Sequence, residues 1–214
     1  MSGHVVLLGD SIFDNGAYVR GGPDVVRQLR DVLPGGARAS LLAVDGAVTD
    51  NVKRQLERLP EDATLLVVSA GGNDALGESH LLRQPVRSVG EGVGKLAEAQ
   101  ARFAKRYEAM LDAVVAAGVP AAVCTIYDAN FPPPEGPIVT AALCLFNDVI
   151  TRAAFRRGLP LIDLRLICDD PADYANPIEP SVKAGAKIAA AIAELAEVER
   201  HSDRSVVFAG ARPA

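Results

Sequence analysis

A serine stands directly after a short apolar run near the start of the chain. Residues 5–8 are Val-Val-Leu-Leu, and Gly9, Asp10 and Ser11 follow them. A serine at the carboxyl end of a buried strand can act as a nucleophile in acyl transfer if a nearby base removes its proton. The alternative is a structural role, because serine is also a common N-cap of a following helix.

The next two apolar runs along the chain end in groups that can donate hydrogen bonds. One ends at Asp45-Gly46, and the other ends at Gly71-Gly72-Asn73-Asp74. A glycine at a strand end lets a backbone N–H approach a ligand, and an asparagine amide can donate to a developing oxyanion. The alternative is that each of these sequences only forms a turn, because both are common in turns. A hydroxyl, a backbone donor and an amide donor at three strand ends together favour an acyl-transfer site.

These residues resemble a known family. Gly9-Asp10-Ser11, Gly46 and Gly71-Gly72-Asn73-Asp74 are similar to the first three sequence blocks of the SGNH (GDSL) hydrolases. The resemblance covers nearly the whole chain and implies a flavodoxin-like sheet with Ser11 as the acyl-accepting nucleophile. It also implies an oxyanion hole formed by the backbone N–H groups of Ser11 and Gly46 and by the side chain of Asn73.

The last block of that family, aspartate-x-x-histidine, has no direct match here. Aligning Pro180 and Gly185 with the family pattern puts Glu179 at the histidine position and Asn176 at the aspartate position. A carboxylate base needs a donor to orient it, and an asparagine amide supplies one. We therefore expect Glu179 to be the base and Asn176 to orient it. The alternative is that Glu179 only complements the dipole of the following helix.

None of the three histidines is expected to replace Glu179 as the base. His4 begins the first strand, and six strand residues at ~3.3 Å each carry it far from Ser11. His80 lies in a different loop from the last block. His201 follows the last helix, whose rise of ~1.5 Å per residue makes its far end remote.

Several other residues are expected to surround the site or to support the fold. The possible pocket residues are Asp10, Asp14, Asn15, Gly72, Asp74 and Tyr127. For Asp14 and Asn15, capping the next helix is the alternative that turn chemistry favours. Asn147 is expected to hydrogen-bond to a strand end. The cysteines, Cys124, Cys144 and Cys168, lack metal-ligand spacing, so we expect buried free thiols and neither a metal nor an organic cofactor.

The order of apolar and amphipathic segments predicts the fold that must position these residues. Continuous apolar runs, typical of strands covered on both faces, occur at residues 5–8, 39–44, 64–69, 121–126 and 160–164. Helical patterns alternate with them at residues 23–33, 49–59, 97–117, 139–157 and 182–199. This alternation predicts a three-layer α/β/α sandwich with a five-stranded parallel, flavodoxin-like sheet. Irregular segments at 77–94 and 128–137 follow strand ends, where such sheets place their sites.

Length and charge limit the remaining possibilities. The 214 residues predict one hydrolase-like domain over 1–200 and a tail over 201–214. A net charge of −5 argues against nucleic acid or an anionic membrane surface as a partner. No apolar run approaches ~20 residues and no secretory pattern begins the chain, so we expect no membrane span and a cytoplasmic location.

Two functions from different classes remain open. The first is a serine esterase or deacylase that acts on a small-molecule acyl ester or sugar ester. The second is a catalytically weak or inactive module that binds an acyl or carbohydrate ligand. The presence of Ser11, Gly46 and Asn73 favours the enzyme, whereas the lack of a histidine in the last block favours the binding module.

Overall fold

The computed structural model describes residues 3–197 and 207–208. Its main sheet is parallel and has the order β2-β1-β3-β4-β5-β8. The strands are β1 (His4–Gly9), β2 (Arg38–Leu41), β3 (Leu65–Ser69), β4 (Ala121–Cys124), β5 (Leu161–Ile162) and β8 (Val207–Phe208). The first five confirm the predicted flavodoxin-like sheet. The sixth, β8, comes from the predicted tail and pairs with β5.

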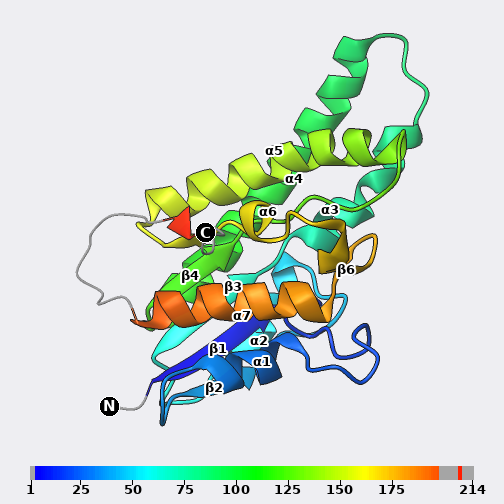
Figure 1. The fold of residues 1–214 in the computed structure, drawn as a ribbon. Coiled ribbons are helices and arrows are strands. Elements are labelled where there is room, and N and C mark those ends of the chain that lie inside the picture. Colours follow the sequence, from blue (N-terminus) through cyan, green and yellow to red (C-terminus); the bar gives the residue numbers. More distant parts are fainter. Residues whose placement is uncertain (1–2, 198–206, 209–214) are drawn as a thin grey trace.

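Helices cover both faces of this sheet (Figure 1). The helices are α1 (Val25–Val32), α2 (Val52–Leu56), α3 (Gly72–Gly77), α4 (Val89–Ala116), α5 (Glu135–Arg156), α6 (Leu164–Ile167) and α7 (Val182–Glu197). The 3-10 turns are η1 (Thr49–Asn51), η2 (Ser79–Arg83) and η3 (Pro171–Asp173). One face packs against α1 and α7, and the other packs against α2, α4 and α5.

The apolar composition of β1 follows from its place between these layers. Val5 and Leu7 point into the core shared with α1 and α7, whereas Val6 and Leu8 point into the core shared with α4 and α5. Successive strand residues face opposite sides, so a strand covered on both sides is apolar at every position. This packing confirms the interpretation of the continuous apolar runs.

Several element boundaries differ from those predicted. The helix α4 begins at Val89, inside the segment predicted to be irregular, because Ser88 caps it by accepting a hydrogen bond from the Glu91 N–H. The predicted helix over 49–59 divides into η1 and α2. An unpredicted antiparallel hairpin pairs β6 (Tyr174–Asn176) with β7 (Glu179–Pro180), and it immediately precedes α7.

The helix α5 has the length and composition of a membrane span, with a mean hydropathy of 1.5; no other helix in the described part of the chain does. Its buried face includes Phe146 and Ile150, which pack in the core beside α4. A core helix of a globular domain passes the same test of length and composition. Packing beside α4 on one face of the sheet accounts for the buried part of α5, which is 39% of its most apolar window.

Two predictions about structural residues can be compared with the fold. Asn147 accepts a hydrogen bond from the Ile126 N–H at 2.8 Å and donates to the Ile126 carbonyl at 2.8 Å, which confirms its predicted role at a strand end. All three cysteines are free thiols, as predicted, but Cys144 is exposed because it lies on the outer face of α5.

Candidate active site

The structure brings Ser11 and Glu179 together from opposite ends of the chain. The Ser11 hydroxyl donates a hydrogen bond to Glu179 Oε1 at 3.2 Å. Both residues are buried, with 8% and 6% of their surface exposed. Ser11 follows β1 at the edge of the sheet, and Glu179 begins β7 in the hairpin before α7. These two elements bring the hydroxyl and the carboxyl group together. The candidate nucleophile and a candidate proton acceptor are therefore within hydrogen-bond reach of each other.

The turn that carries Ser11 depends on a close backbone approach at Gly9. Gly9 has a φ of +121°, and a Cβ at this position would lie 1.6 Å from the Ser69 carbonyl oxygen. The Gln55 side chain holds the same residue, because its Oε1 accepts from the Gly9 N–H at 2.7 Å and its Nε2 donates to the Gly9 carbonyl at 2.8 Å. Gln55 was not predicted; its only signal is a polar residue within an amphipathic pattern.

Two side chains hold the backbone on either side of Glu179. Asn15 donates to the Pro180 carbonyl at 3.3 Å and accepts from the Val25 N–H at 3.0 Å. Tyr127 donates its hydroxyl hydrogen to the Ile178 carbonyl at 2.7 Å. These bonds connect the hairpin to the loop after β1 and to the end of β4, and so they orient Glu179 towards Ser11.

Asn176 and Glu179 are paired in the hairpin, but the predicted side-chain hydrogen bond between them is absent from the structure. Asn176 is exposed, and its side-chain oxygen accepts from the Ile178 N–H at 2.9 Å. Asparagine often bonds to the backbone two residues later, and here that local turn competes with the longer-range bond. Glu179 Oε2 is buried and has no hydrogen-bond partner among the described residues.

The three groups implied as oxyanion donors lie on adjacent segments. The Asn73 amide donates to the Ala47 carbonyl at 3.0 Å, which ties α3 to the loop that contains Gly46. Within the described residues, the backbone N–H groups of Ser11 and Gly46 donate to no other group. Gly46 is exposed and has a φ of +75°. Asn73 faces the cavity beside Ser11, whereas Gly46 does not line that cavity.

Burial changes the ionisation of two carboxyl groups here. Burial raises the pKa of Glu179 to about 7, and the nearby charge of Asp45 adds to this effect while the Ser11 hydrogen bond opposes it. Burial also raises the pKa of Asp10 to about 7, against the hydrogen bond from the Ile12 N–H and with the charge of Glu179 adding to it. Near neutral pH, Glu179 is therefore divided between its protonated and ionised forms.

A cavity of about 610 Å³ opens beside Ser11 and Glu179. Its walls are mainly apolar and come from α4, α5, η2 and the segment after β4, with Leu96, Ala99, Ile126, Phe131, Leu143 and Phe146 among the lining residues. Of the predicted pocket residues, Asp10, Gly72 and Tyr127 line it. Such a cavity has the size and apolar lining of a small-molecule site.

The other three predicted pocket residues do not line this cavity. Asp14 accepts from the Asp45 N–H at 2.9 Å, and Asn15 holds the hairpin as described above. Asp74 accepts from the N–H and the hydroxyl of Thr49, at 2.9 and 3.0 Å. Asn15 accepts from the Val25 N–H at the start of α1, in line with the capping alternative. Asp14 and Asp74 instead bond to segments 31 and 25 residues away, so they hold separate segments together rather than cap the next helix.

No histidine hydrogen-bonds to Ser11 in the part of the chain that the structure describes. His4 contacts Asp62 at 2.8 Å, at the opposite end of β1. His80 is exposed and lines the cavity, but its Nδ1 lies 3.2 Å from the Gly77 carbonyl oxygen. His201 lies outside the described residues. In residues 3–197 and 207–208, no group of three potential metal ligands is found either.

Comparison with known proteins gives the family of this chain. The model of the GDSL-like lipase/acylhydrolase family matches residues 7–198. The chain belongs to this family. Its fold is similar to that of an extracellular lipase from Streptomyces rimosus, with 20% identity, a TM-score of 0.64, and 87% of this chain and 96% of that chain covered.

A second solved structure supports the same fold. An α/β hydrolase from the metagenome of Lake Arreo, Spain, shares 18% identity with this member of the GDSL-like family, with a TM-score of 0.66. The match covers 92% of this chain and 96% of the other. No curated protein matches the sequence.

Proposed function

We propose that this GDSL-family protein is a serine ester hydrolase in which Ser11 is the nucleophile and Glu179 is the general base. The observation that carries the proposal is the 3.2 Å hydrogen bond from the Ser11 hydroxyl to Glu179 Oε1, beside an apolar cavity. In this proposal, Glu179 takes the role of the histidine in the family's last block. Asn15 and Tyr127 position Glu179, the role that the sequence assigned to Asn176.

The first half of the reaction forms an acyl-enzyme. Ionised Glu179 takes the hydroxyl proton as Ser11 Oγ attacks the carbonyl carbon of the ester. The Ser11 N–H and the Asn73 amide, which lie at the cavity, stabilise the oxyanion of the tetrahedral intermediate. The Gly46 N–H, on the adjoining loop outside the lining of the cavity, is the third donor that the family resemblance implies. The intermediate then releases the alcohol, which takes the proton from Glu179.

The second half releases the acid. A water molecule attacks the acyl carbon and gives a proton to Glu179. The tetrahedral intermediate collapses, the carboxylic acid leaves, and Ser11 recovers its proton from Glu179. Both halves need Glu179 ionised at the start, and its pKa of about 7 makes it a stronger base than an ordinary glutamate while leaving it partly ionised at neutral pH.

Labelling with a fluorophosphonate tests the nucleophile directly, because the probe reacts with activated serines. The expected result is labelling of the wild type at Ser11, none in Ser11→Ala, and hydrolysis of a p-nitrophenyl ester that is lost in the same variant. Ser79→Ala is the matched control, since Ser79 lines the cavity but makes no bond to Glu179.

The same experiment separates the enzyme from the alternative binding module. A module without catalysis would bind a ligand in the cavity but would leave the probe unreacted at every pH. Glu179→Gln keeps the size of the side chain but cannot accept a proton, so labelling and hydrolysis should fall by about a hundredfold or more if Glu179 is the base. Unchanged rates in Glu179→Gln would contradict its role.

A further inference from the structure

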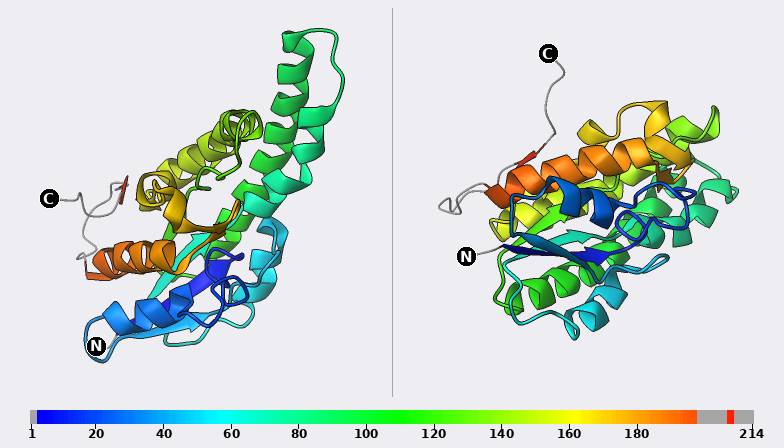
Figure 2. Two further views of the ribbon diagram at one scale, coloured as in Figure 1. Left: turned by 45° about the vertical axis from the view of Figure 1, so that its right-hand side comes forward. Right: turned by 60° about the horizontal axis from the view of Figure 1, so that its bottom comes forward.

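The amino-terminal end of α4 stands away from the body of the molecule. Residues 79–96, here called the arm, comprise η2, a connecting loop and the first two turns of α4. Figure 2 shows this end of the helix and the loop before it projecting beyond the sheet and the other helices. In chain order, the arm leaves the sheet edge after Asn73 and returns along α4 to the core.

The arm exposes apolar side chains that continue the wall of the cavity. Val89 and Val93 are 84% and 57% exposed, and Val86 in the adjoining loop is 44% exposed. Val89, Val93 and Leu96 lie at i, i+4 and i+7, on one face of α4. Leu96 lines the cavity, so one apolar stripe leads from the tip of the arm into the candidate active site.

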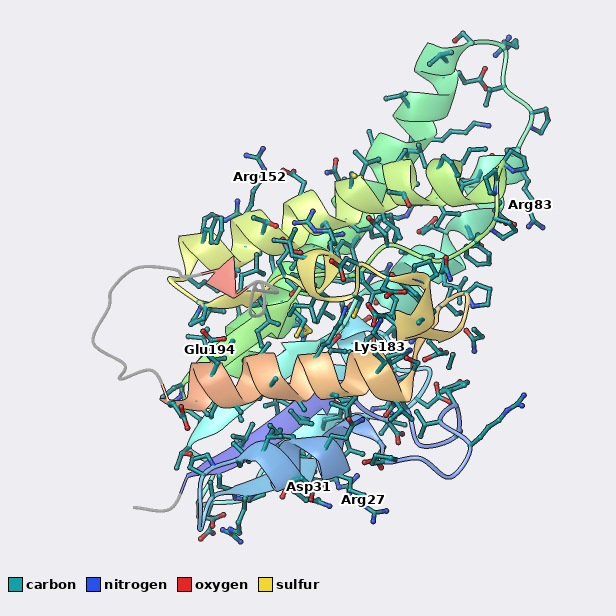
Figure 3. The ribbon with its side chains drawn as sticks, viewed as in Figure 1. Arg27, Asp31, Arg83, Arg152, Lys183 and Glu194 are labelled. Carbon is teal, nitrogen blue, oxygen red and sulfur yellow. The ribbon has the colours of Figure 1, made fainter. Side chains whose placement is uncertain are left out.

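The arm also differs in charge from the rest of the chain. Residues 79–96 carry three cations, Arg83, Arg87 and Lys95, and one carboxylate, Glu91. Arg87 and Lys95 share Glu91, with N···O separations of 3.6 and 3.7 Å. Arg83 contacts Glu135 at 3.1 Å, and its side chain points outward at the base of the arm (Figure 3). The chain as a whole has a net charge of −5.

We propose that the arm docks on the surface of an anionic lipid aggregate and turns the cavity entrance towards it. Exposed valines beside arginine and lysine match the combination by which helices bind at a lipid–water interface. The η2 residues Leu82 and Arg83 line the cavity, so docking places its entrance against the surface. The negative net charge, which argued against such a partner, is a sum over the whole molecule, whereas residues 79–96 carry three cations against one carboxylate, with Glu135 as a second carboxylate beside Arg83.

This inference rests on the proposed function only for the reason why docking would be useful. The docking itself can be measured without catalysis. Full-length Ser11→Ala protein is sedimented with vesicles of phosphatidylcholine alone and with vesicles of an equal mixture of phosphatidylcholine and phosphatidylglycerol. The expected result is binding to the mixed vesicles that weakens as salt is raised. Ser11→Ala cannot hydrolyse the lipid, so failure of binding is distinguished from failure of the hydrolase proposal.

Variants in this background locate the docking surface. Val89→Ser with Val93→Ser should weaken binding to mixed vesicles by about tenfold, because each valine loses apolar surface that the lipid would bury. Arg87→Glu should weaken it by about fivefold or more. Val115→Ser is the matched control, because Val115 is 48% exposed at the other end of the same helix. Circular dichroism should report the same helix content for all four proteins.

Several outcomes would overturn the proposal. The Ser11→Ala protein could fail to bind either kind of vesicle, or it could bind both kinds equally. Val115→Ser could also lose as much binding as the Val89→Ser, Val93→Ser variant. Elution of the Ser11→Ala protein as a dimer that separates in the Val89→Ser, Val93→Ser variant would also overturn it. In that case, the apolar stripe serves a second copy of the chain rather than a lipid surface.

Discussion

At the scale of single residues, the proposed site has a buried glutamate where a serine–histidine pair has an imidazole, and the two groups have similar pKa values. An exposed glutamate has a pKa near ~4.3 and is a weak acceptor for a serine proton, whereas histidine lies near ~6.5. Burial of Glu179 moves its pKa to about 7, into the range of histidine. The proposed roles of Ser11 as nucleophile and Glu179 as base therefore need no imidazole.

The pH dependence of hydrolysis should report the ionisation of Glu179. Because the base must be deprotonated, kcat/KM should rise with pH through about 7 and be about tenfold lower at pH 6 than on the alkaline plateau. Asp45→Asn should move this rise to lower pH, because the charge of Asp45 helps to hold the pKa of Glu179 up. Initial rates on a p-nitrophenyl ester measure both effects. A flat profile from pH 5 to about 9 would rule out Glu179 as the base.

The same raised pKa predicts a cost in stability that depends on pH. The folded state holds the Glu179 proton more tightly than the unfolded chain, so the stability that this proton contributes is present at low pH and is lost as pH rises from about 4.5 to about 7. At pH 8, Glu179→Gln should therefore be more stable than wild type by up to about 3 kcal/mol in the free energy of unfolding, and it should unfold at a higher temperature. At pH 4, the two proteins should unfold at nearly the same temperature. Thermal denaturation of both proteins at the two pH values tests this.

At the scale of elements, the nucleophile turn is determined by contacts between strand ends. Gly9 allows the backbone of β1 to approach Ser69 of β3, and the Gln55 amide from α2 satisfies both polar backbone groups of Gly9. The hairpin of β6 and β7 then brings Glu179 to the same edge. The position of Ser11 therefore depends on β3 and α2 as well as on its own strand, and its contact with Glu179 depends on the hairpin.

Substitution of Gly9 should test how strongly the turn depends on this approach. In Gly9→Ala, the added Cβ would lie 1.6 Å from the Ser69 carbonyl oxygen, and alanine is strained at a φ of +121°. We therefore expect loss of the folded protein. Gly35→Ala is the control, because a Cβ at Gly35 meets no atom within 4 Å. Yield of soluble protein and circular dichroism distinguish the two, and a folded, active Gly9→Ala protein would contradict the observed approach.

At the scale of the whole molecule, the sheet edge, α4 and α5 enclose a cavity with an apolar wall and a polar end. Ser11, Glu179 and Asn73 form part of the polar end, and the apolar residues of α4 and α5 form the wall. This arrangement is suited to an ester with an apolar acyl group, because each methylene buried there stabilises the complex by about 0.8 kcal/mol. Hydrolysis should therefore be faster for octanoyl than for acetyl esters.

Narrowing the cavity should reverse this preference. Ala142 lines the cavity from α5, whereas its neighbour Ala141 is exposed and does not. Ala142→Phe should lower kcat/KM for a p-nitrophenyl octanoate by about tenfold more than for the acetate, because the ring fills space that the longer chain needs. Ala141→Phe should leave both values near those of wild type. Equal losses on the two esters in Ala142→Phe would place the acyl group elsewhere.

The fold class and the candidate nucleophile could be predicted from the sequence because both depend on local patterns. Continuous apolar runs mark strands covered on both faces, and glycine at a strand end marks a turn that side chains would obstruct. The pairing of Ser11 with Glu179 was predicted by alignment with a family pattern. Residues from both predicted irregular segments line the cavity. The size and apolar wall of the cavity, the Gln55 amide and the arm were not predicted, because each depends on which segments become neighbours.

Asn176 shows why tertiary structure decided the rest. Its distance of three residues from Glu179 suggested a side-chain contact, but in a tight hairpin the nearest free donor is the Ile178 N–H. Asn15 and Tyr127, which lie far from Glu179 in sequence, supply the contacts that hold it. Sequence alone determined the kinds of groups present and the layers that carry them. Their partners, their burial and the resulting pKa of Glu179 depend on packing between segments up to 168 residues apart, which only the folded chain establishes.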